Sequence, residues 1–336
     1  MPNRPPLQNA PPDLGDFDDI LGAPSASAAR PHALEPSPSE SASLLVHERA
    51  EVGVVETQGP SLTEFVQAWD LYRDPVLAGV LAGVALGLAG VFVVLRRAIF
   101  VTAAISQAAG LGVACAFLLA IVVDLEIPPV LLAFAFAGLG AFILALRPPR
   151  RLPREAVVGF MYVATSALAI VVGDRISQEA HDIAAILFGS AVLVRPLDLL
   201  LVATVGGILL AVVVALSRGL TFAGFDPDAA VVQGLPVRSL ETVLWVSVAA
   251  EVAVATRALG ALPVFAFTIL PALGALRLCR RLHHALWLAA LIGAVSGGVG
   301  YVLAFLLELP VGASQTVMAA LIAVTCWGAA RLVLRG

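Results

Sequence analysis

The sequence predicts an all-α, polytopic membrane protein with about eight or nine transmembrane helices and a disordered N-terminal tail. Apolar stretches near 20 residues long follow one another from Pro75 to Gly336, and each is long enough to cross the ~30 Å hydrocarbon core of a bilayer. Of the 336 residues, 60% are hydrophobic and 13% are charged, against roughly 25% charged residues in soluble domains. Short loops that carry arginine separate the stretches. These observations argue against a soluble enzyme.

Residues 1–60 form an acidic segment rich in Pro, Ser and Ala and poor in aromatic residues. Residues 1–74 hold 4 Arg against 12 Asp and Glu. Such a composition buries too little apolar surface to offset the entropy lost on ordering the backbone. The segment also lacks the basic region and the continuous apolar core of a signal peptide. We therefore expect a disordered tail over residues 1–60 and membrane insertion that begins at the first span.

A short amphipathic helix is expected over residues 61–74. Ser61 and Glu64 have the spacing of a capping box. The apolar residues that share one face of this helix are Leu62, Phe65, Val66 and Trp69. Tyr72 and Trp69 suit headgroup depth, where an aromatic ring and its polar tip are both accommodated. The pattern favours an interfacial helix, and a soluble helix that leads into the membrane would show the same amphipathicity.

Nine apolar segments are candidates for crossing the membrane. They cover residues 76–95, 100–122, 128–146, 154–173, 196–217, 240–258, 261–279, 285–307 and 313–333. Nine crossings place the two termini on opposite faces. Because this leaves a tail of about 70 residues outside without a signal peptide, an arrangement with eight spans, or with a re-entrant first segment, stays open.

The loops rich in arginine all lie on one face of this topology. They are Arg96-Arg97, 147–154, 218–238, 277–281 and the C-terminal end with Arg331 and Arg335. The positive-inside rule makes that face cytoplasmic. Loops that hold Asp124, Glu126 and Glu308, together with residues 174–182, then face outward.

Glycines recur every four residues in two of the predicted spans. Gly79, Gly83 and Gly87 form one smooth face in the first span, and Gly293 and Gly297 share a face in the eighth. Small residues at this spacing let two helix backbones approach closely in a membrane. We therefore expect these glycines to have structural roles in helix packing.

The outward segment 181–190 is too short to cross the membrane and too apolar for a free loop. A short helix that dips back toward a central cavity fits it, since backbone at membrane depth must be covered by protein or line water. His181 and Asp182 lie at its start, close to Glu179. They are candidates for an outer patch that collects metal ions, although charges in an exposed loop commonly do no more than contact water.

The cytoplasmic segment GFDPDAAVVQGLPV, residues 224–237, predicts a short helix at about 225–235. Asp226 is placed to cap the N-terminus, and Pro227 falls at the first helical position, where a missing N–H has no consequence. Asp228 favours the helix dipole, and Gly234 ends the helix.

This segment resembles the fDpe-A-x-x-x-G-i-x-v coupling element of the ABC-3 family, the permease subunits of zinc, manganese and iron importers. The residues that match are Phe225, Asp226, Pro227, Ala230 and Gly234. Further similarities follow in the family's order. GLAGVFVVLRR from Gly87 is similar to the family's glycine-rich first span, and Leu187-Phe188-Gly189 is similar to its LfG segment. LGALPVFAFTILPALGALR from Leu259 is similar to vGxLLvxAlLixPaxxAr, with Pro271 at the position of the family's proline. Leu309-Pro310-Val311-Gly312 matches the dlPxG turn. Several motifs in the correct order are far more specific than any one of them.

The resemblance implies a type II ABC importer permease fold like that of vitamin B12 importers, in the inner membrane of a bacterium. It also implies a homodimer around one central pathway, a separate ATPase on each cytoplasmic face and a solute-binding protein outside that delivers zinc, manganese or iron. The chain has no lysine and hence no G-x-x-x-x-G-K-[ST] phosphate loop, so ATP is expected on the partner subunit. We expect no cofactor on this chain, contact with membrane lipid, and no nucleic-acid partner.

The second span departs from the family. Members often carry gDAlSHa there, whose Asp and His can ligate a divalent ion. Here Ala103 replaces the Asp and Gln107 replaces the His, while Ser106 remains. Ser106 and Gln107 are neutral polar groups at membrane depth, and an amide binds zinc less well than imidazole. Either ligation has moved elsewhere or the substrate differs, so the identity of the metal, and a non-metal substrate of the same fold, both stay open.

Glu251 lies near the middle of a predicted span, where an ionised carboxylate is costly and usually faces a cavity or a partner. It is a candidate for the substrate pathway. A structural carboxylate near Arg257 at a packed dimer interface satisfies the same argument.

Two other classes of protein compete with an ABC permease. A secondary transporter or channel would be expected to show inverted repeats or paired interrupted helices, and no convincing repeat is visible. An intramembrane enzyme would need a motif such as H-E-x-x-H or G-x-S-x-G, and neither occurs. Cys115, Cys279 and Cys326 have no C-x-x-C spacing and indicate neither a disulfide framework nor a zinc site.

Overall fold

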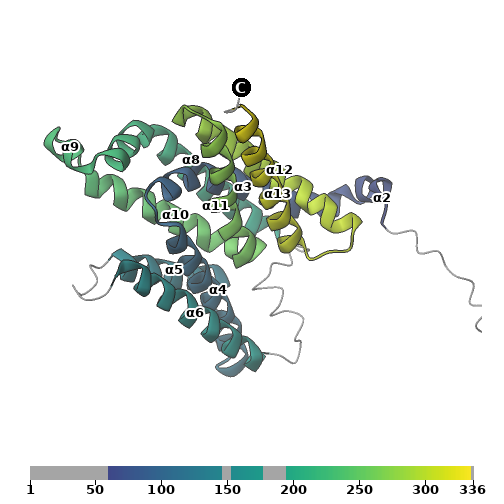
Figure 1. Ribbon diagram of the computed structural model, residues 1–336. Coiled ribbons are helices and arrows are strands. Elements are labelled where there is room, and N and C mark those ends of the chain that lie inside the picture. Colours follow the sequence, from purple (N-terminus) through teal and green to yellow (C-terminus); the bar gives the residue numbers. More distant parts are fainter. Residues whose placement is uncertain (1–59, 146–152, 177–193, 334–336) are drawn as a thin grey trace, which may run out of the picture. The chain divides into compact units, whose positions relative to one another are not determined.

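The computed structural model describes residues 60–145, 153–176 and 194–333. Helices joined by short connections make up this part of the chain (Figure 1). The helices are α2 (Leu62–Gln67), α3 (Trp69–Leu95), α4 (Ile99–Val122), α5 (Pro129–Ala145), α6 (Arg154–Ile176), α8 (Pro196–Phe225), α9 (Pro227–Val232), α10 (Val237–Leu259), α11 (Ala261–Leu278), α12 (Leu282–Leu306) and α13 (Val311–Val333). The predicted all-α class is confirmed for the described residues.

Eight of the described helices are long and apolar enough to cross a membrane: α3, α4, α6, α8, α10, α11, α12 and α13. The apolar part of α5, Pro129–Leu144, is shorter. Each of the nine predicted segments coincides with one helix, with ends that differ by several residues. The segment that falls short of full length is therefore the third. The first predicted segment, whose crossing was left open, is part of the 27-residue α3.

The membrane part of the chain begins with the capping box that the sequence predicts. The Glu64 N–H donates to Ser61 Oγ at 3.3 Å, and the Ser61 N–H donates to Glu64 Oε2 at 3.1 Å. The expected helix over residues 61–74 is divided at Ala68, where φ is −94° and ψ is 21°. The division allows Phe65 to stack on Tyr72 with ring centroids 5.4 Å apart. In an unbroken helix these residues would be separated by about 10 Å of axial rise.

An aromatic cluster joins this start to α12. Phe65 and Tyr72 lie with ring centroids 5.2 and 5.0 Å from Phe305, and each is 6.4 Å from Tyr301. The other apolar residues of α2 and its neighbour remain exposed: Leu62, Val66 and Trp69. This combination suits a short element that is packed on the bundle at one side and presents apolar side chains at the other.

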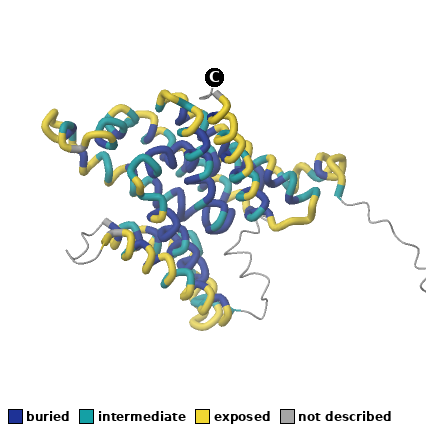
Figure 2. The backbone as a smooth tube through the Cα atoms, viewed as in Figure 1, coloured by how far each residue is buried: buried dark blue, intermediate teal, exposed yellow. Residues whose placement is uncertain are grey.

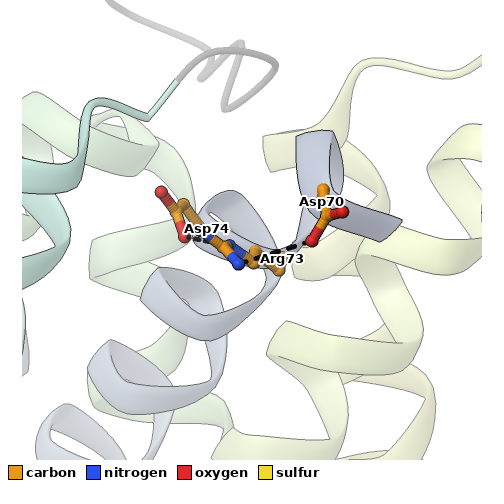
Figure 3. Close-up of polar contacts among 3 residues, drawn as sticks. All are labelled: Asp70, Arg73 and Asp74. Atoms are coloured by element: carbon orange, nitrogen blue, oxygen red, sulfur yellow. Dashed lines mark hydrogen bonds and ion pairs between the residues drawn. The ribbon is translucent and has the colours of Figure 1, made fainter. Parts of the chain in front are cut away.

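Arg73 lies between two carboxylates in the first turns of α3 (Figure 3). Its Nη1 is 3.4 Å from Asp70 Oδ1, and its Nε is 3.3 Å from Asp74 Oδ1. The Asp70 side chain is 95% exposed, so its pair contributes at most about 1 kcal/mol. The contacts fix the direction of Arg73 more than they stabilise the fold.

Helix α3 is the most buried of the spanning helices, and it contacts α8, α10, α11 and α12 (Figure 2). Its closest neighbour is α12. A Cβ added at Gly83 would collide with the Gly293 carbonyl, and one added at Gly293 would collide with the Gly83 carbonyl. A Cβ at Gly87 would lie 2.6 Å from the Ala289 carbonyl oxygen. The two backbones thus approach each other along the glycine face of α3.

Helix α10 lies between two groups of helices. It contacts α3 and α8 on one side and α4 and α5 on the other, while α6 packs mainly on α4. Gly260 alone joins α10 to α11, with φ of +96°, a conformation that L side chains rarely adopt. The second half of α10, from Val248 to Leu259, is consequently mostly buried, whereas its first half keeps exposed residues such as Val246.

Candidate functional site

Glu251 lies in the middle of α10, and its side chain is fully buried. It points toward α8, because a Cβ added at Gly206 would be 3.2 Å from Glu251 Oε1 and 3.3 Å from the Ala85 Cβ of α3. Within the described part of the chain, neither carboxylate oxygen has a hydrogen-bond partner. A buried polar group without a partner is costly in an apolar interior. In this conformation Glu251 is covered by α3 and α8 instead of facing an open path.

Arg257, which the sequence offers as a neighbour of Glu251, pairs with a different acid. Its Nη1 forms an ion pair with Asp198 Oδ1 in the first turn of α8. The two side chains are 16% and 10% exposed. The pair ties the N-terminal end of α8 to the C-terminal end of α10 and leaves Glu251 without a cation from this source.

We expect Arg257→Met to lower the free energy of unfolding by about 3–5 kcal/mol, because it leaves Asp198 as an uncompensated buried charge. Thermal unfolding of the purified protein in detergent measures the loss. Adding Asp198→Leu to Arg257→Met should recover most of it, since two apolar side chains can replace a buried ion pair. Arg238→Met removes an exposed arginine from the same helix and should have little effect. Equal losses in Arg257→Met and in the double variant would contradict this role for the pair.

Helix α4 carries the polar residues that the second span retains. Ser106 is buried, and its Oγ donates to the Ala103 carbonyl at 2.9 Å. Gln107 is half-buried, and its Oε1 is buried without a hydrogen-bond partner among the described residues. The Ser106 hydroxyl proton is thus used within its own helix, while the Gln107 amide oxygen stays unpaired.

A third residue with an unpaired oxygen lies on α10, the helix that carries Glu251 and contacts α4. Thr256 of α10 is buried, and its Oγ1 lacks a partner in the described ranges. A Cβ added at Gly110 of α4 would lie 4.0 Å from Thr256 Cγ2, so the two helices meet there. Over the same ranges no group of three or more His, Cys, Asp or Glu is placed to hold a metal ion. The buried side-chain atoms of α4 and α10 that lack a hydrogen-bond partner in these ranges are all oxygens, and each is a potential metal ligand.

The predicted cytoplasmic helix is present as α9, which lies at the tip where α8 and α10 meet (Figure 1). Asp226 caps it by accepting from the Ala229 N–H at 2.9 Å. Pro227 occupies its first turn. The helix ends in a Schellman motif: the Leu235 N–H donates to the Ala230 carbonyl, and Gly234, with φ of +80°, donates to Val231.

The two faces of α9 differ in character. Ala230 is fully buried against Ala223 of α8 and Val237 of α10, so its side chain packs within the chain. Phe225, Val231 and Val232 are 69%, 61% and 88% exposed. Phe225 is the last residue of α8, and Val231 and Val232 end α9. We call these three exposed apolar side chains at the tip of the two helices the α9 patch.

An ion pair near α9 links α10 to the core. Arg96 caps the C-terminus of α3, and its Nη1 is 3.2 Å from Glu241 Oε1 of α10. The Arg96 side chain is 9% exposed. Burial lowers the pKa of Arg96 from its ordinary value, and the nearby Glu241 carboxylate opposes that shift. Helix α10 is thus held to α3 near its N-terminus and to α8 near its C-terminus.

Of the remaining residues that the sequence singled out, one lies in a described helix and the others lie outside the described residues. Pro271 is buried in α11, and its Cβ lies 3.4 Å from a Cβ added at Gly87, on the side of α3 that meets α12 and α11. His181, Asp182 and the expected dipping helix over residues 181–190 lie outside the described residues.

Sequence reasoning did not single out Asp198, Thr256 or Val232. Asp198 carried a usable signal, because an acid inside the start of a predicted span requires a partner. Val232 carried another, because it is apolar and belongs to a cytoplasmic loop. Nothing in the sequence distinguishes Thr256 from the hydroxyls that bond to their own helix.

The sequence of this chain is similar to those of known membrane transport proteins. Residues 68–328 match the model of the ABC 3 transport family. The chain is similar to the manganese transport system membrane protein MntC of Halalkalibacterium halodurans, with 26% identity over 254 residues that cover 75% of this chain and 85% of that protein. It is 30% identical over 250 residues to MntC of Bacillus subtilis, covering 71% and 57%. It is also 26% identical over 256 residues to the chelated iron transport system membrane protein YfeD of Yersinia pestis, covering 76% and 84%.

Two solved structures have the same fold. PsaBC from Streptococcus pneumoniae in complex with Fab superposes with a TM-score of 0.70 at 22% identity, covering 80% of this chain and 95% of that chain. An inward-facing conformation of an ABC transporter assigned to the metal-chelate type gives a TM-score of 0.64 at 18% identity, covering 88% and 98%. The described helices thus have the arrangement of metal-chelate ABC importer permeases.

Proposed function

We propose a cargo for this chain, which belongs to the ABC 3 transport family of multi-pass membrane permease subunits. The cargo is a divalent first-row transition metal, and manganese or iron is favoured over zinc. ATP is hydrolysed on a separate subunit in this family, and this chain has no lysine with which to build a phosphate loop. Relatives named for a cargo include manganese and chelated iron systems. These names support a metal cargo for this chain.

The preference for manganese or iron over zinc rests on the buried oxygen atoms that could ligate the ion. Glu251 offers a carboxylate, Gln107 an amide oxygen and Thr256 a hydroxyl, and all are unpaired on α4 and α10. Oxygen ligands suit manganese, whereas imidazole and thiolate ligands suit zinc. The family's Asp and His positions hold Ala103 and Gln107 here, so the charged ligand of the pathway is Glu251 on α10.

Access to Glu251 requires movement of α10 against α8, because those two helices and α3 cover the carboxylate. Helix α10 begins five residues after α9 ends, and the Schellman turn at Gly234 joins them. A partner ATPase docked on the α9 patch would therefore act directly on the helix that carries Glu251. In this proposal a second copy of the chain completes the central pathway, and a solute-binding protein delivers the ion at the outer face.

Elemental analysis of manganese, iron and zinc tests the cargo. Cells that lack the gene are grown in metal-poor medium and supplied with the wild-type protein or with Glu251→Gln. We expect a deficit of manganese or iron that the wild type restores. Glu251→Gln keeps the shape but removes the charge, and should slow uptake about tenfold, the effect of losing roughly 1.4 kcal/mol of interaction with the ion.

Glu155→Gln is the matched control, because Glu155 is exposed in the first turn of α6. It should transport at the wild-type rate. Unchanged content of all three metals in the deleted cells would overturn a metal cargo and would redirect the search to a non-metal substrate of the same fold. A zinc deficit alone would overturn the ranking drawn from the oxygen donors.

A further inference from the structure

The cytoplasmic ends of α11, α12 and α13 carry exposed arginine and histidine side chains that we call the basic cluster. Its members are Arg277, Arg280, Arg281, His283, His284 and Arg331. Between residues 261 and 333 the sole acidic residue is Glu308, which follows the opposite end of α12. Within the described part of the chain, none of the four arginines forms an ion pair. Buried arginines such as Arg96 and Arg257 do have carboxylate partners. The exposed arginines of the basic cluster are instead free to bind molecules outside the chain.

Contacts between α11 and α13 place Arg277 and Arg331 at the same level. Trp327 Nε1 lies 3.4 Å from the Leu273 carbonyl, and a Cβ added at Gly274 would be 3.2 Å from Ala323 Cα. Arg277 follows Leu273 by one helical turn, and Arg331 follows Trp327 by one turn. The N-terminus of α12 adds to this cluster, because Arg281 provides no side-chain cap for its free N–H groups and the helix dipole there favours an anion.

The exposed face of α12 shows what lies beside the basic cluster. His283, Trp287, Leu291, Val295 and Val299 recur every four residues along it. The last four are 50%, 59%, 38% and 42% exposed. The His283 and Trp287 rings lie 6.3 Å apart. A helix that faces lipid presents aliphatic residues to the bilayer core, an aromatic ring at the interface and basic side chains at the headgroups. The exposed residues of α12 follow this order.

The basic cluster is also separate from the α9 patch. Helix α9 contacts α8 and α10, and Figure 1 shows it well away from the C-terminal end of α13. The acids at the start of α9, Asp226 and Asp228, have no counterpart at the basic cluster. Docking of an ATPase on α9 therefore does not require the basic cluster.

We propose that the basic cluster binds the phosphodiester headgroups of anionic phospholipids in the cytoplasmic leaflet. Each exposed arginine near an anionic surface strengthens such binding, and two adjacent guanidinium groups at Arg280 and Arg281 present several donors to phosphate oxygens. The bound lipid holds the cytoplasmic ends of α11, α12 and α13 together. Because α11 and α12 form the close contacts to α3, the lipid stabilises the folded permease.

The test uses the full-length protein in a zwitterionic detergent, titrated with short-chain phosphatidylglycerol, short-chain phosphatidylcholine or inorganic phosphate. We expect phosphatidylglycerol to raise the thermal unfolding temperature, and the other two to have no effect at equal concentration. Arg280→Gln/Arg281→Gln should weaken the apparent affinity for phosphatidylglycerol about 25-fold, from roughly fivefold for each arginine. Arg277→Gln/Arg331→Gln should weaken it similarly.

Arg218→Gln/Arg238→Gln is the matched control, because it removes two exposed cytoplasmic arginines from α8 and α10. It should respond to phosphatidylglycerol like the wild type. An equal loss in this control would overturn the assignment to α11–α13, and equal stabilisation by inorganic phosphate would replace a lipid site with a free-anion site. Loss of ATPase co-purification in the Arg280/Arg281 variant, with the lipid response intact, would make the cluster a protein-docking surface and overturn the proposal.

Discussion

Gly83→Ala is expected to destabilise the permease by on the order of 1–3 kcal/mol, although it adds a single methyl group. The new Cβ would meet the Gly293 carbonyl, which is backbone and cannot move aside by rotating a side chain. Helices α3 and α12 would have to separate, and α3 is the most buried of the spanning helices. Gly83→Leu should leave no folded protein. Thermal unfolding and gel filtration in detergent measure both effects.

Gly207→Ala provides the control, because it adds the same methyl group in the middle of α8, where no atom lies within 4 Å of the added Cβ. It should be neutral or slightly stabilising, since alanine has a better helix propensity than glycine. Gly293→Ala should destabilise like Gly83→Ala, and the double variant should lose less than the sum, because one separation of the helices accommodates both methyl groups. Wild-type stability in Gly83→Ala would rule out close backbone packing at this position.

Local features of this chain were predictable because their causes lie close together in the sequence. The apolar segments, the capping box at Ser61 and the cap of α9 by Asp226 each depend on a few neighbouring residues. The short cytoplasmic helix could also be predicted together with its end, since Gly234 takes the positive φ that glycine adopts easily. The break at Ala68 was different, because it depends on Phe65 reaching Tyr72 and the rings of α12.

The environment of Glu251 could not be read from the sequence. An acid in the middle of a span predicts a cavity or a partner, but the direction of the side chain depends on which helices pack around α10. Gly206, 45 residues away, makes room for the carboxylate, and Arg257, the arginine near Glu251 in the sequence, forms an ion pair with Asp198 instead. Such choices are made by contacts between distant segments, for which no local pattern exists.

Helix α10 connects the residues to which the proposed function assigns a role in transport. It follows α9, and it carries Glu251, Thr256 and both of the ion-paired residues that hold its ends, Glu241 and Arg257. A rigid helix held at two ends can move as a body when one end is displaced. Displacement of α9 would thus change the packing around Glu251 without unfolding any helix.

Phe225→Ala and Asp226→Arg are expected to abolish most transport while leaving the permease folded. Phe225 is 69% exposed in the α9 patch, and truncation of an apolar anchor at an interface costs about 2 kcal/mol or more of binding. Asp226→Arg removes the N-cap of α9 and places a positive charge at the positive end of the helix dipole. Metal uptake by cells and co-purification of the ATPase should both fall, and the thermal unfolding temperature of the isolated permease should stay close to that of the wild type.

Asp226→Asn separates the two roles of Asp226. Asparagine caps a helix about as well as aspartate, so this variant keeps α9 but loses the charge. If the helix itself is the docking element, Asp226→Asn should transport far better than Asp226→Arg. Val246→Ala, at a valine of α10 that is 62% exposed and lies outside the α9 patch, controls for the loss of an exposed apolar side chain. Full uptake and full ATPase co-purification in both Phe225→Ala and Asp226→Arg would place the docking surface elsewhere, and the proposed coupling of α9 to Glu251 would be overturned.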